Sequence, residues 1–99
     1  MTIAIIDYGM GNLKSVKKAF AALDFNAEIT ADPEMILKAD KVVLPGVGAF
    51  RDAIAELNIS GLAEATKEVV KKGTPLLGIC LGMKLLFDKS YEYGTYEGL

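Results

Sequence analysis

Histidine is absent from this chain of 99 residues, and cysteine occurs once, as Cys80. A single cysteine cannot form an internal disulfide bond, and without histidine the common mixed-ligand zinc sites cannot be assembled. The absence of histidine also removes the most frequent general base of enzymes. The composition therefore predicts neither a structural disulfide nor a metal site, and no motif indicates a cofactor.

An excess of charge of either sign is also missing, because 11 basic residues are balanced by 13 acidic ones. This balance excludes the polyelectrolyte character of a nucleic-acid-binding domain. The apolar run near the N-terminus is far too short to span a bilayer and lacks the basic segment of a signal peptide. We therefore expect no nucleic-acid partner, no membrane and a cytoplasmic location. The length predicts a single domain over residues 1–99.

Four short apolar runs, at residues 2–7, 27–30, 41–45 and 75–80, predict β-strands. Each run is continuous rather than alternating, which is typical of parallel strands buried on both faces. Helical patterns lie between the runs, so we expect βαβ units with right-handed crossovers. The predicted fold class is α/β, with a doubly wound, mostly parallel, flavodoxin-like sheet.

Capping residues mark the helix boundaries. Asp32 followed by Pro33 predicts the start of a short helix within residues 31–39, and Gly73 after two lysines predicts a helix end. Apolar residues at spacings of three and four predict two further helices with core-facing stripes. The stripes consist of Leu13, Val16, Ala19, Phe20 and Leu23, and of Leu62, Ala65, Val69 and Val70.

Glycine-rich segments follow three of the predicted strands, at residues 7–12, 45–50 and 78–83. Ligands in doubly wound sheets bind beyond the carboxyl ends of the strands, so these loops form the candidate site. The alternative is that the glycines only permit tight strand-to-helix turns. The first loop matches a dinucleotide-binding fingerprint in part, but Lys14 replaces its third glycine and weakens that interpretation.

Cys80 lies between Gly78 and Gly82 in the pattern glycine, any residue, nucleophile, any residue, glycine. This pattern predicts a sharp turn that exposes the sulfur at a helix N-terminus, where the thiolate is stabilised. The backbone N–H of Leu81 then points to the position of an oxyanion. A packing cysteine is the alternative, but flanking glycines weaken a strand without any packing gain and so favour the nucleophile.

The second glycine-rich loop offers a further backbone N–H to the same oxyanion, from Val47 or Gly48. An ordinary strand-to-helix connection is the alternative for this loop.

Together these segments resemble the class I glutamine amidotransferases, and within them the glutaminase branch of histidine biosynthesis. The stretches "IAIIDYGMGNL" (3–13), "VVLPGVGAF" (42–50) and "GICLGMKLLF" (78–87) are similar to the signatures of that branch in order and spacing. The resemblance implies the amidotransferase fold and glutamine as the substrate. It also implies a (β/α)8-barrel cyclase subunit as the partner that receives the ammonia.

The resemblance implies roles for individual residues as well. Cys80 would attack the carboxamide of glutamine to form a thioester, while Leu81 and the peptide between Val47 and Gly48 stabilise the oxyanion. Lys84 stands where the family carries a glutamine that contacts the substrate, and a lysine cannot accept a hydrogen bond from the substrate amino group. Contacts with the partner are implied near Tyr8, Met10 and Asn12.

Members of this family are about twice as long, and the histidine and glutamate that assist the nucleophile lie in their second half. We therefore expect a truncated N-terminal part of an amidotransferase domain, inactive on its own. One alternative keeps the chemistry but delivers ammonia for the amidation of a sugar. A second is a module that binds the partner without turnover, and a third, disfavoured by Lys14, is a nucleotide-binding domain.

Overall fold

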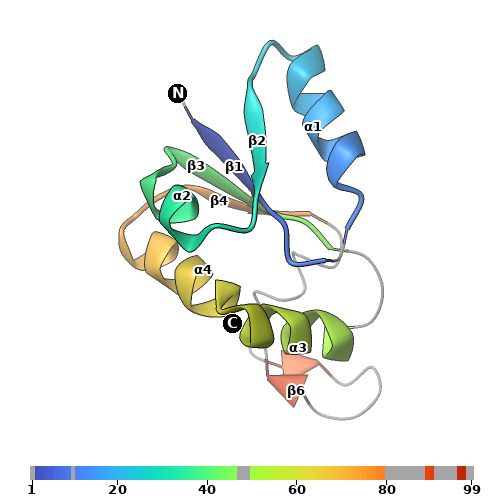
Figure 1. Cartoon of the computed structure of the whole chain (residues 1–99), viewed down its shortest axis with the longest axis vertical. Coiled ribbons are helices and arrows are strands. Elements are labelled where there is room, and N and C mark those ends of the chain that lie inside the picture. The colour runs from blue at the N-terminus through green and yellow to red at the C-terminus, as the bar shows by residue number, and fades with distance from the viewer. Residues whose placement is uncertain (1, 10, 47–49, 80–88, 91–95, 98–99) are drawn as a thin grey trace.

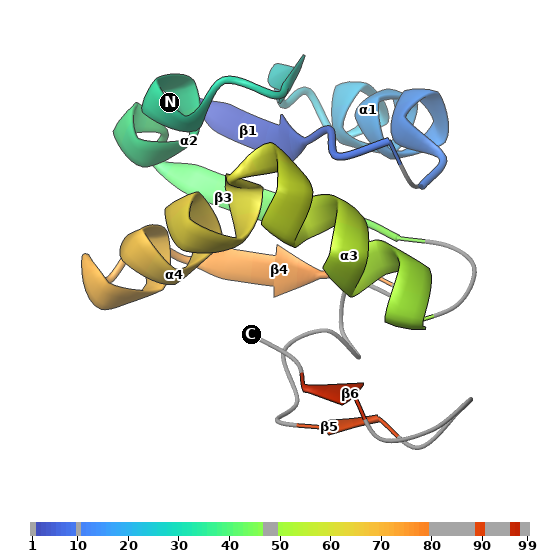
Figure 2. The same ribbon diagram turned by 60° about the horizontal axis from the view of Figure 1, so that its bottom comes forward.

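The structure is a computed structural model that describes residues 2–9, 11–46, 50–79, 89–90 and 96–97. Its centre is a four-stranded sheet in the order β2-β1-β3-β4, with every neighbouring pair parallel. The strands β1, β3 and β4 point the same way in Figure 2. The predicted parallel sheet is therefore confirmed, with strands β1 (Ile3–Ile6), β2 (Ala27–Thr30), β3 (Lys41–Leu44) and β4 (Leu76–Gly78).

Helices cover both faces of this sheet. Among the described helices, α1 (Leu13–Ala22) lies on one face, and α2 (Pro33–Lys38) and α4 (Leu62–Lys71) lie on the other (Figure 1). Helix α3 (Phe50–Ser60) adds buried side chains to the same cluster as α2 and α4. The chain moves outward from β1 to β2, then reverses through β3 to β4, and this reversal puts the crossovers on opposite faces.

The predicted helix boundaries are confirmed by the capping geometry. The Asp32 carboxylate accepts a hydrogen bond from the Glu34 N–H at 3.0 Å, and Pro33 is the first residue of α2. Gly73 follows the end of α4 with φ at +86°, which favours glycine. The sequence reasoning did not delimit α3, whose buried Ala53 and Leu57 are four residues apart.

The main core lies between the sheet and α2, α3 and α4. It contains fully buried side chains from β1 and β3 and from all three helices. The largest of these side chains are Ile6, Ile36, Leu44, Leu57 and Leu62. The strands β1 and β3 are buried along almost their whole length, as predicted for the centre of a parallel sheet.

The opposite face is covered less completely than the sequence predicts. Helix α1 contains no fully buried residue: Leu13, Val16 and Phe20 of its stripe are half-buried, and Leu23 is 67% exposed. The expectation that this stripe is a core face is therefore wrong in its extent. Within the described residues, α1 is the one helix on this face, and no other described helix covers its flank.

The two edge strands also differ from the prediction of burial on both faces. Glu28 on β2 is exposed, and Leu77 on β4 has 54% of its surface exposed. Among the described strands, β2 pairs only with β1 and β4 only with β3, so each has a neighbour on one side. Val70 of the second helical stripe is 54% exposed as well, one step off the buried face of α4.

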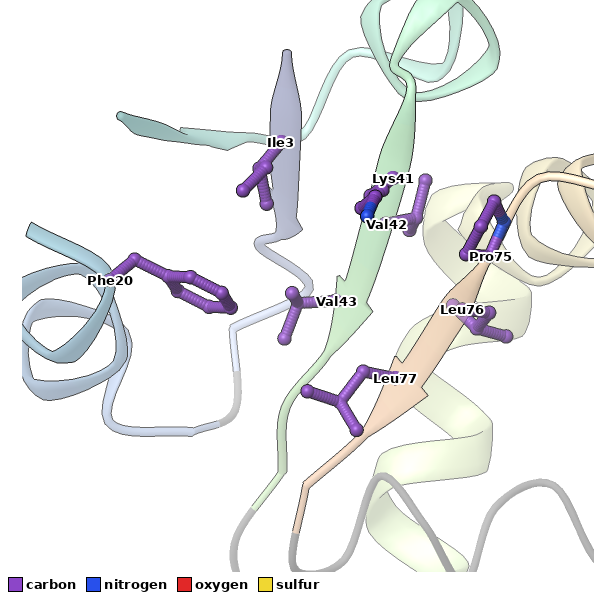
Figure 3. A pocket seen from close by; sticks show the side chains of 8 residues that line it. All are labelled: Ile3, Phe20, Lys41, Val42, Val43, Pro75, Leu76 and Leu77. Carbon is purple, nitrogen blue, oxygen red and sulfur yellow. The ribbon is translucent and has the colours of Figure 1, made fainter. Parts of the chain in front are cut away.

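The open part of this face forms an apolar groove in two parts. One part has a volume of about 160 Å³ and runs from Ile3 and Phe20 to Leu77 (Figure 3). The other, of about 430 Å³, lies between α1 and the end of β4, where Leu23, Leu77 and Ile79 line it. Phe20 and Leu77 line both parts, so the two parts lie next to each other on the α1 side of the sheet.

A second, two-stranded antiparallel sheet joins β5 (Lys89–Ser90) to β6 (Tyr96–Glu97), apart from the parallel sheet. In the part of the chain that the structure describes, no helix is long and apolar enough to cross a membrane. Nor do the described residues contain a group of three or more His, Cys, Asp or Glu side chains able to hold a metal ion.

Candidate functional site

The strands that lead into the second and third glycine-rich loops are adjacent and in register. Leu44 of β3 pairs with Gly78 of β4, and the Ile79 N–H donates to the Leu44 carbonyl at 3.0 Å. Pro45 and Gly46, which continue from β3, are buried. The two loops therefore leave the sheet side by side at its carboxyl edge, as the sequence predicts for the candidate site.

The first glycine-rich loop reaches the same edge from β1. The Asp7 N–H donates to the Thr30 carbonyl at 2.9 Å and so continues the pairing with β2. Tyr8 then turns inward, and its hydroxyl donates to the Pro45 carbonyl at 2.6 Å. This hydrogen bond joins residues 37 positions apart and links the first loop to the second.

The start of α1 is capped by the chain itself. The Asn12 side chain accepts a hydrogen bond from the Ser15 N–H at 3.4 Å, and Asp7 accepts one from the Gly9 N–H at 3.2 Å. Beside it, the crevice between β1 and β3, where doubly wound sheets commonly bind nucleotides, contains the buried Tyr8 ring. These contacts, together with Lys14, count against the nucleotide-binding alternative.

Among the predicted site residues, Tyr8 and Asn12 belong to the described part of the chain. Asn12 is exposed, whereas Tyr8 is buried as a whole residue, with 4% of its surface exposed. Both partner contacts stay predictions. The remaining predicted site residues lie outside the described residues: Met10, Val47, Gly48, Cys80, Leu81 and Lys84. Gly46 and Ile79 are the described residues next in sequence to the peptide between Val47 and Gly48 and to Cys80.

The apolar groove is not the candidate site. It lies on the α1 face, and its lining is aliphatic and aromatic apart from Lys41 and Ser15. Glutamine carries an amide, an amino and a carboxylate group, and burial of these groups without hydrogen-bond partners is unfavourable. We therefore interpret the groove as a gap in the cover of the sheet rather than as a binding site for glutamine.

Sequence reasoning missed the internal role of two residues in the first loop. Gly11 has φ at +120°, and a Cβ atom there would lie 3.3 Å from both the Gly46 nitrogen and the Pro45 Cβ. Tyr8 contacts the same segment through its hydroxyl. Neither contact has a local sequence signal, because the partners are more than thirty positions away along the chain.

Burial raises the pKa of Tyr8 to about 12, from the usual 10.0. Because the pKa is higher in the folded chain, the neutral phenol contributes stability below pH 10, and this contribution is lost as the pH rises toward 12. We expect a titration of tyrosinate absorbance to show one phenol that ionises near pH 12 and is missing in Tyr8→Phe. Loss of a phenol that ionises near pH 10 instead would contradict the burial of this ring.

The family model for glutamine amidotransferase class-I matches residues 4–94 of this chain. The chain belongs to this family. The three glycine-rich loops of this amidotransferase chain all fall within the matched residues, and so does Cys80. The family assignment agrees with the parallel sheet and with the pairing of β3 and β4, the strands that lead into the second and third loops.

Several curated relatives resemble the amidotransferase chain closely. This chain is 58% identical over 98 residues to the imidazole glycerol phosphate synthase subunit HisH of Geobacter metallireducens. These residues are 99% of this chain and 47% of that protein. The subunit HisH of Carboxydothermus hydrogenoformans is 57% identical over 99 residues, which are 100% of this chain and 49% of that protein. The subunit HisH of Wolinella succinogenes is 50% identical over 97 residues, which are 98% of this chain and 47% of that protein. The chain spans about half the length of the curated relatives it matches.

Proposed function

We propose that this chain is the nucleophile-bearing, N-terminal part of the glutaminase subunit of imidazole glycerol phosphate synthase. The observation that carries the proposal is the placement of β3 beside β4. The Ile79 N–H bonds to the Leu44 carbonyl, so the segments that run into the peptide between Val47 and Gly48 and into Cys80 start next to each other. The identity to the HisH subunits over nearly the whole chain supports the same assignment.

In this proposal the Cys80 thiolate attacks the carbonyl carbon of the glutamine side-chain amide. The N–H groups of Leu81 and of the peptide between Val47 and Gly48 stabilise the oxyanion. The C–S bond forms and the C–N bond breaks as a proton is delivered to the leaving nitrogen, which departs as ammonia. Water then hydrolyses the thioester to glutamate and returns the thiol, so one difficult hydrolysis becomes two easier steps.

The remaining parts of the proposal concern the whole protein. Residues 1–99 are the N-terminal part of a single amidotransferase domain, which acts in the cytoplasm as part of a heterodimer with a (β/α)8-barrel cyclase that uses the ammonia in histidine biosynthesis. The contacts with that partner lie near Tyr8, Met10 and Asn12. Among the alternatives, amidation of a sugar keeps the same chemistry and differs in the ammonia acceptor. A partner-binding module without turnover keeps the surface and loses the chemistry.

A chimera tests this proposal without any assumption about the rest of the protein. In the chimera, this chain replaces the matching 98 residues of the Geobacter metallireducens subunit, which is purified with the cyclase of that organism. We expect the chimera to release ammonia from glutamine, the cyclase to consume it, and Cys80→Ala to abolish both. Cys80-dependent ammonia release without use by the cyclase would favour the sugar-amidating alternative. Assembly without ammonia release would favour the partner-binding module.

Substitution of Lys84, unlike that of Cys80, should improve the function of the chimera. Because lysine cannot accept a hydrogen bond from the substrate amino group, Lys84→Gln should lower the KM of the chimera for glutamine. One recovered hydrogen bond to a charged group corresponds to about tenfold. Lys84→Met, which removes the charge without adding an acceptor, is the control. An unchanged or higher KM in Lys84→Gln would show that Lys84 does not impair glutamine binding.

A further inference from the structure

Tyr8 links the segments that follow the carboxyl ends of β1 and β3. The direction of winding reverses at this pair of strands, which is the place where doubly wound folds usually receive a ligand. The Tyr8 ring is buried here with 4% of its surface exposed, and its hydroxyl donates to the Pro45 carbonyl at 2.6 Å. A side chain of β1's own loop therefore holds the first residue after β3.

Gly11 touches the same segment from the side. Its φ of +120° is a conformation that glycine adopts readily and other residues rarely do. A Cβ atom at this position would lie 3.3 Å from the Gly46 nitrogen and 3.5 Å from the Pro45 Cγ. By contrast, a Cβ atom on Gly73, at φ +86°, would meet nothing within 4 Å. Thus Gly11 combines an unusual backbone conformation with close contact, whereas Gly73 has only the conformation.

We propose that Tyr8 and Gly11 are positioning residues for glutamine hydrolysis, because they fix Pro45 and Gly46 and thereby set where the peptide between Val47 and Gly48 begins. This inference rests on the proposed function, in which that peptide donates an N–H to the oxyanion. Tyr8 does not touch the substrate in this role. Its hydroxyl aims the Pro45 carbonyl, and the rigid sheet below Leu44 holds the other end of the segment.

The hydroxyl and the ring make separable contributions. Phenylalanine would fill nearly the same volume in the main core but could not bond to the Pro45 carbonyl, so Tyr8→Phe frees the segment without leaving a large cavity. A displaced oxyanion donor weakens binding of the transition state more than binding of the substrate. The loss should therefore appear in kcat rather than in KM.

The test measures glutamine hydrolysis by the chimera with its cyclase, at a temperature well below the melting point of every variant. We expect Tyr8→Phe to lower kcat roughly tenfold to a hundredfold while the KM for glutamine changes less than about twofold. Gly11→Ala should lower kcat in the same way, because its methyl group displaces Pro45 and Gly46. Gly73→Ala, which also places a side chain on a residue with positive φ but without that contact, should leave kcat unchanged.

The outcomes separate the two levels of the proposal. If the unsubstituted chimera shows no Cys80-dependent ammonia release, the proposed function itself fails. If it is active and Tyr8→Phe lowers only the melting temperature with kcat intact, Tyr8 is structural and the inference is wrong. Equal effects of Gly11→Ala and Gly73→Ala would also overturn it, because backbone strain alone would then explain both. Should Tyr8→Phe not fold, the comparison of the two glycine variants still decides the question.

Discussion

Glutamine added to the 99-residue chain alone should yield no more ammonia than its Cys80→Ala variant yields, and iodoacetamide should still alkylate Cys80 under native conditions. Ammonia is a poor leaving group unless it is protonated, and the chain contains no histidine to deliver that proton. A thiolate stabilised at a helix N-terminus replaces only the first proton transfer. Alkylation needs no protonated amine, so the two reactions separate.

The chimera supplies the comparison for this prediction. General acid–base catalysis contributes about 10²- to 10⁴-fold, so turnover by the short chain should fall below that of the chimera by at least that factor. Ammonia release and alkylation are measured on the same preparations, with Cys80→Ala as the blank. Turnover by the short chain well above this blank would show that a residue within it acts as the acid. Alkylation of Cys80 only after denaturation would make it a packing cysteine.

The second large effect concerns the stability of the main core. Leu57 of α3 is fully buried between the sheet and α4, and Leu57→Ala should lower the free energy of unfolding by about 2–5 kcal/mol. A domain of this size has a total of about 5–15 kcal/mol, so much of its stability would be lost. Urea unfolding followed by circular dichroism measures the change.

Ile59 is the matched control on the same helix. It lies two residues further along α3 and is 81% exposed, so Ile59→Ala should change the free energy of unfolding by no more than about 0.5 kcal/mol. Similar losses in both variants would contradict the packing of α3 against the sheet. If Leu57→Ala lowers the free energy of unfolding only slightly, the surrounding core must collapse around the smaller side chain.

The centre of the fold could be predicted from the sequence because its signals are local. The continuous apolar runs of β1 and β3 follow directly from burial on both faces. The boundary of α2 follows from Asp32 and Pro33, whose effects extend over one helical turn. Helix α3 was not delimited, although the spacing of Ala53 and Leu57 was a usable signal for it.

The degree of cover on the α1 face could not be predicted from the same signals. The apolar stripe of α1 shows which side of the helix faces the sheet, and Leu13, Val16 and Phe20 do lie toward it. It does not show whether a neighbouring helix encloses that side, and the exposure of Leu23 and Leu77 depends on that neighbour. Periodicity reports direction, whereas burial depends on what else packs there.

Part of the candidate site was also beyond local reasoning. The glycine pattern around Cys80 and the order of the three loops could be recognised in the sequence. The register of β3 and β4 brings together the starts of the second and third loops. The Tyr8 hydrogen bond to Pro45 has no local pattern, and Tyr8 was interpreted as a partner contact because of its place in a family motif. A single tertiary contact across the sheet edge decides where that side chain goes.

The account centres on Cys80 as the nucleophile that attacks glutamine at this edge of the sheet, and covalent trapping tests it most directly. The chimera with its cyclase is incubated with a glutamine analogue that carries a chloroketone in place of the amide, and the adduct is located by peptide mass mapping. We predict one adduct, on Cys80, that glutamine suppresses in proportion to its occupancy and that is absent from Cys80→Ala. An adduct on another residue, or labelling of Cys80 at a rate that saturating glutamine does not change, would contradict the account.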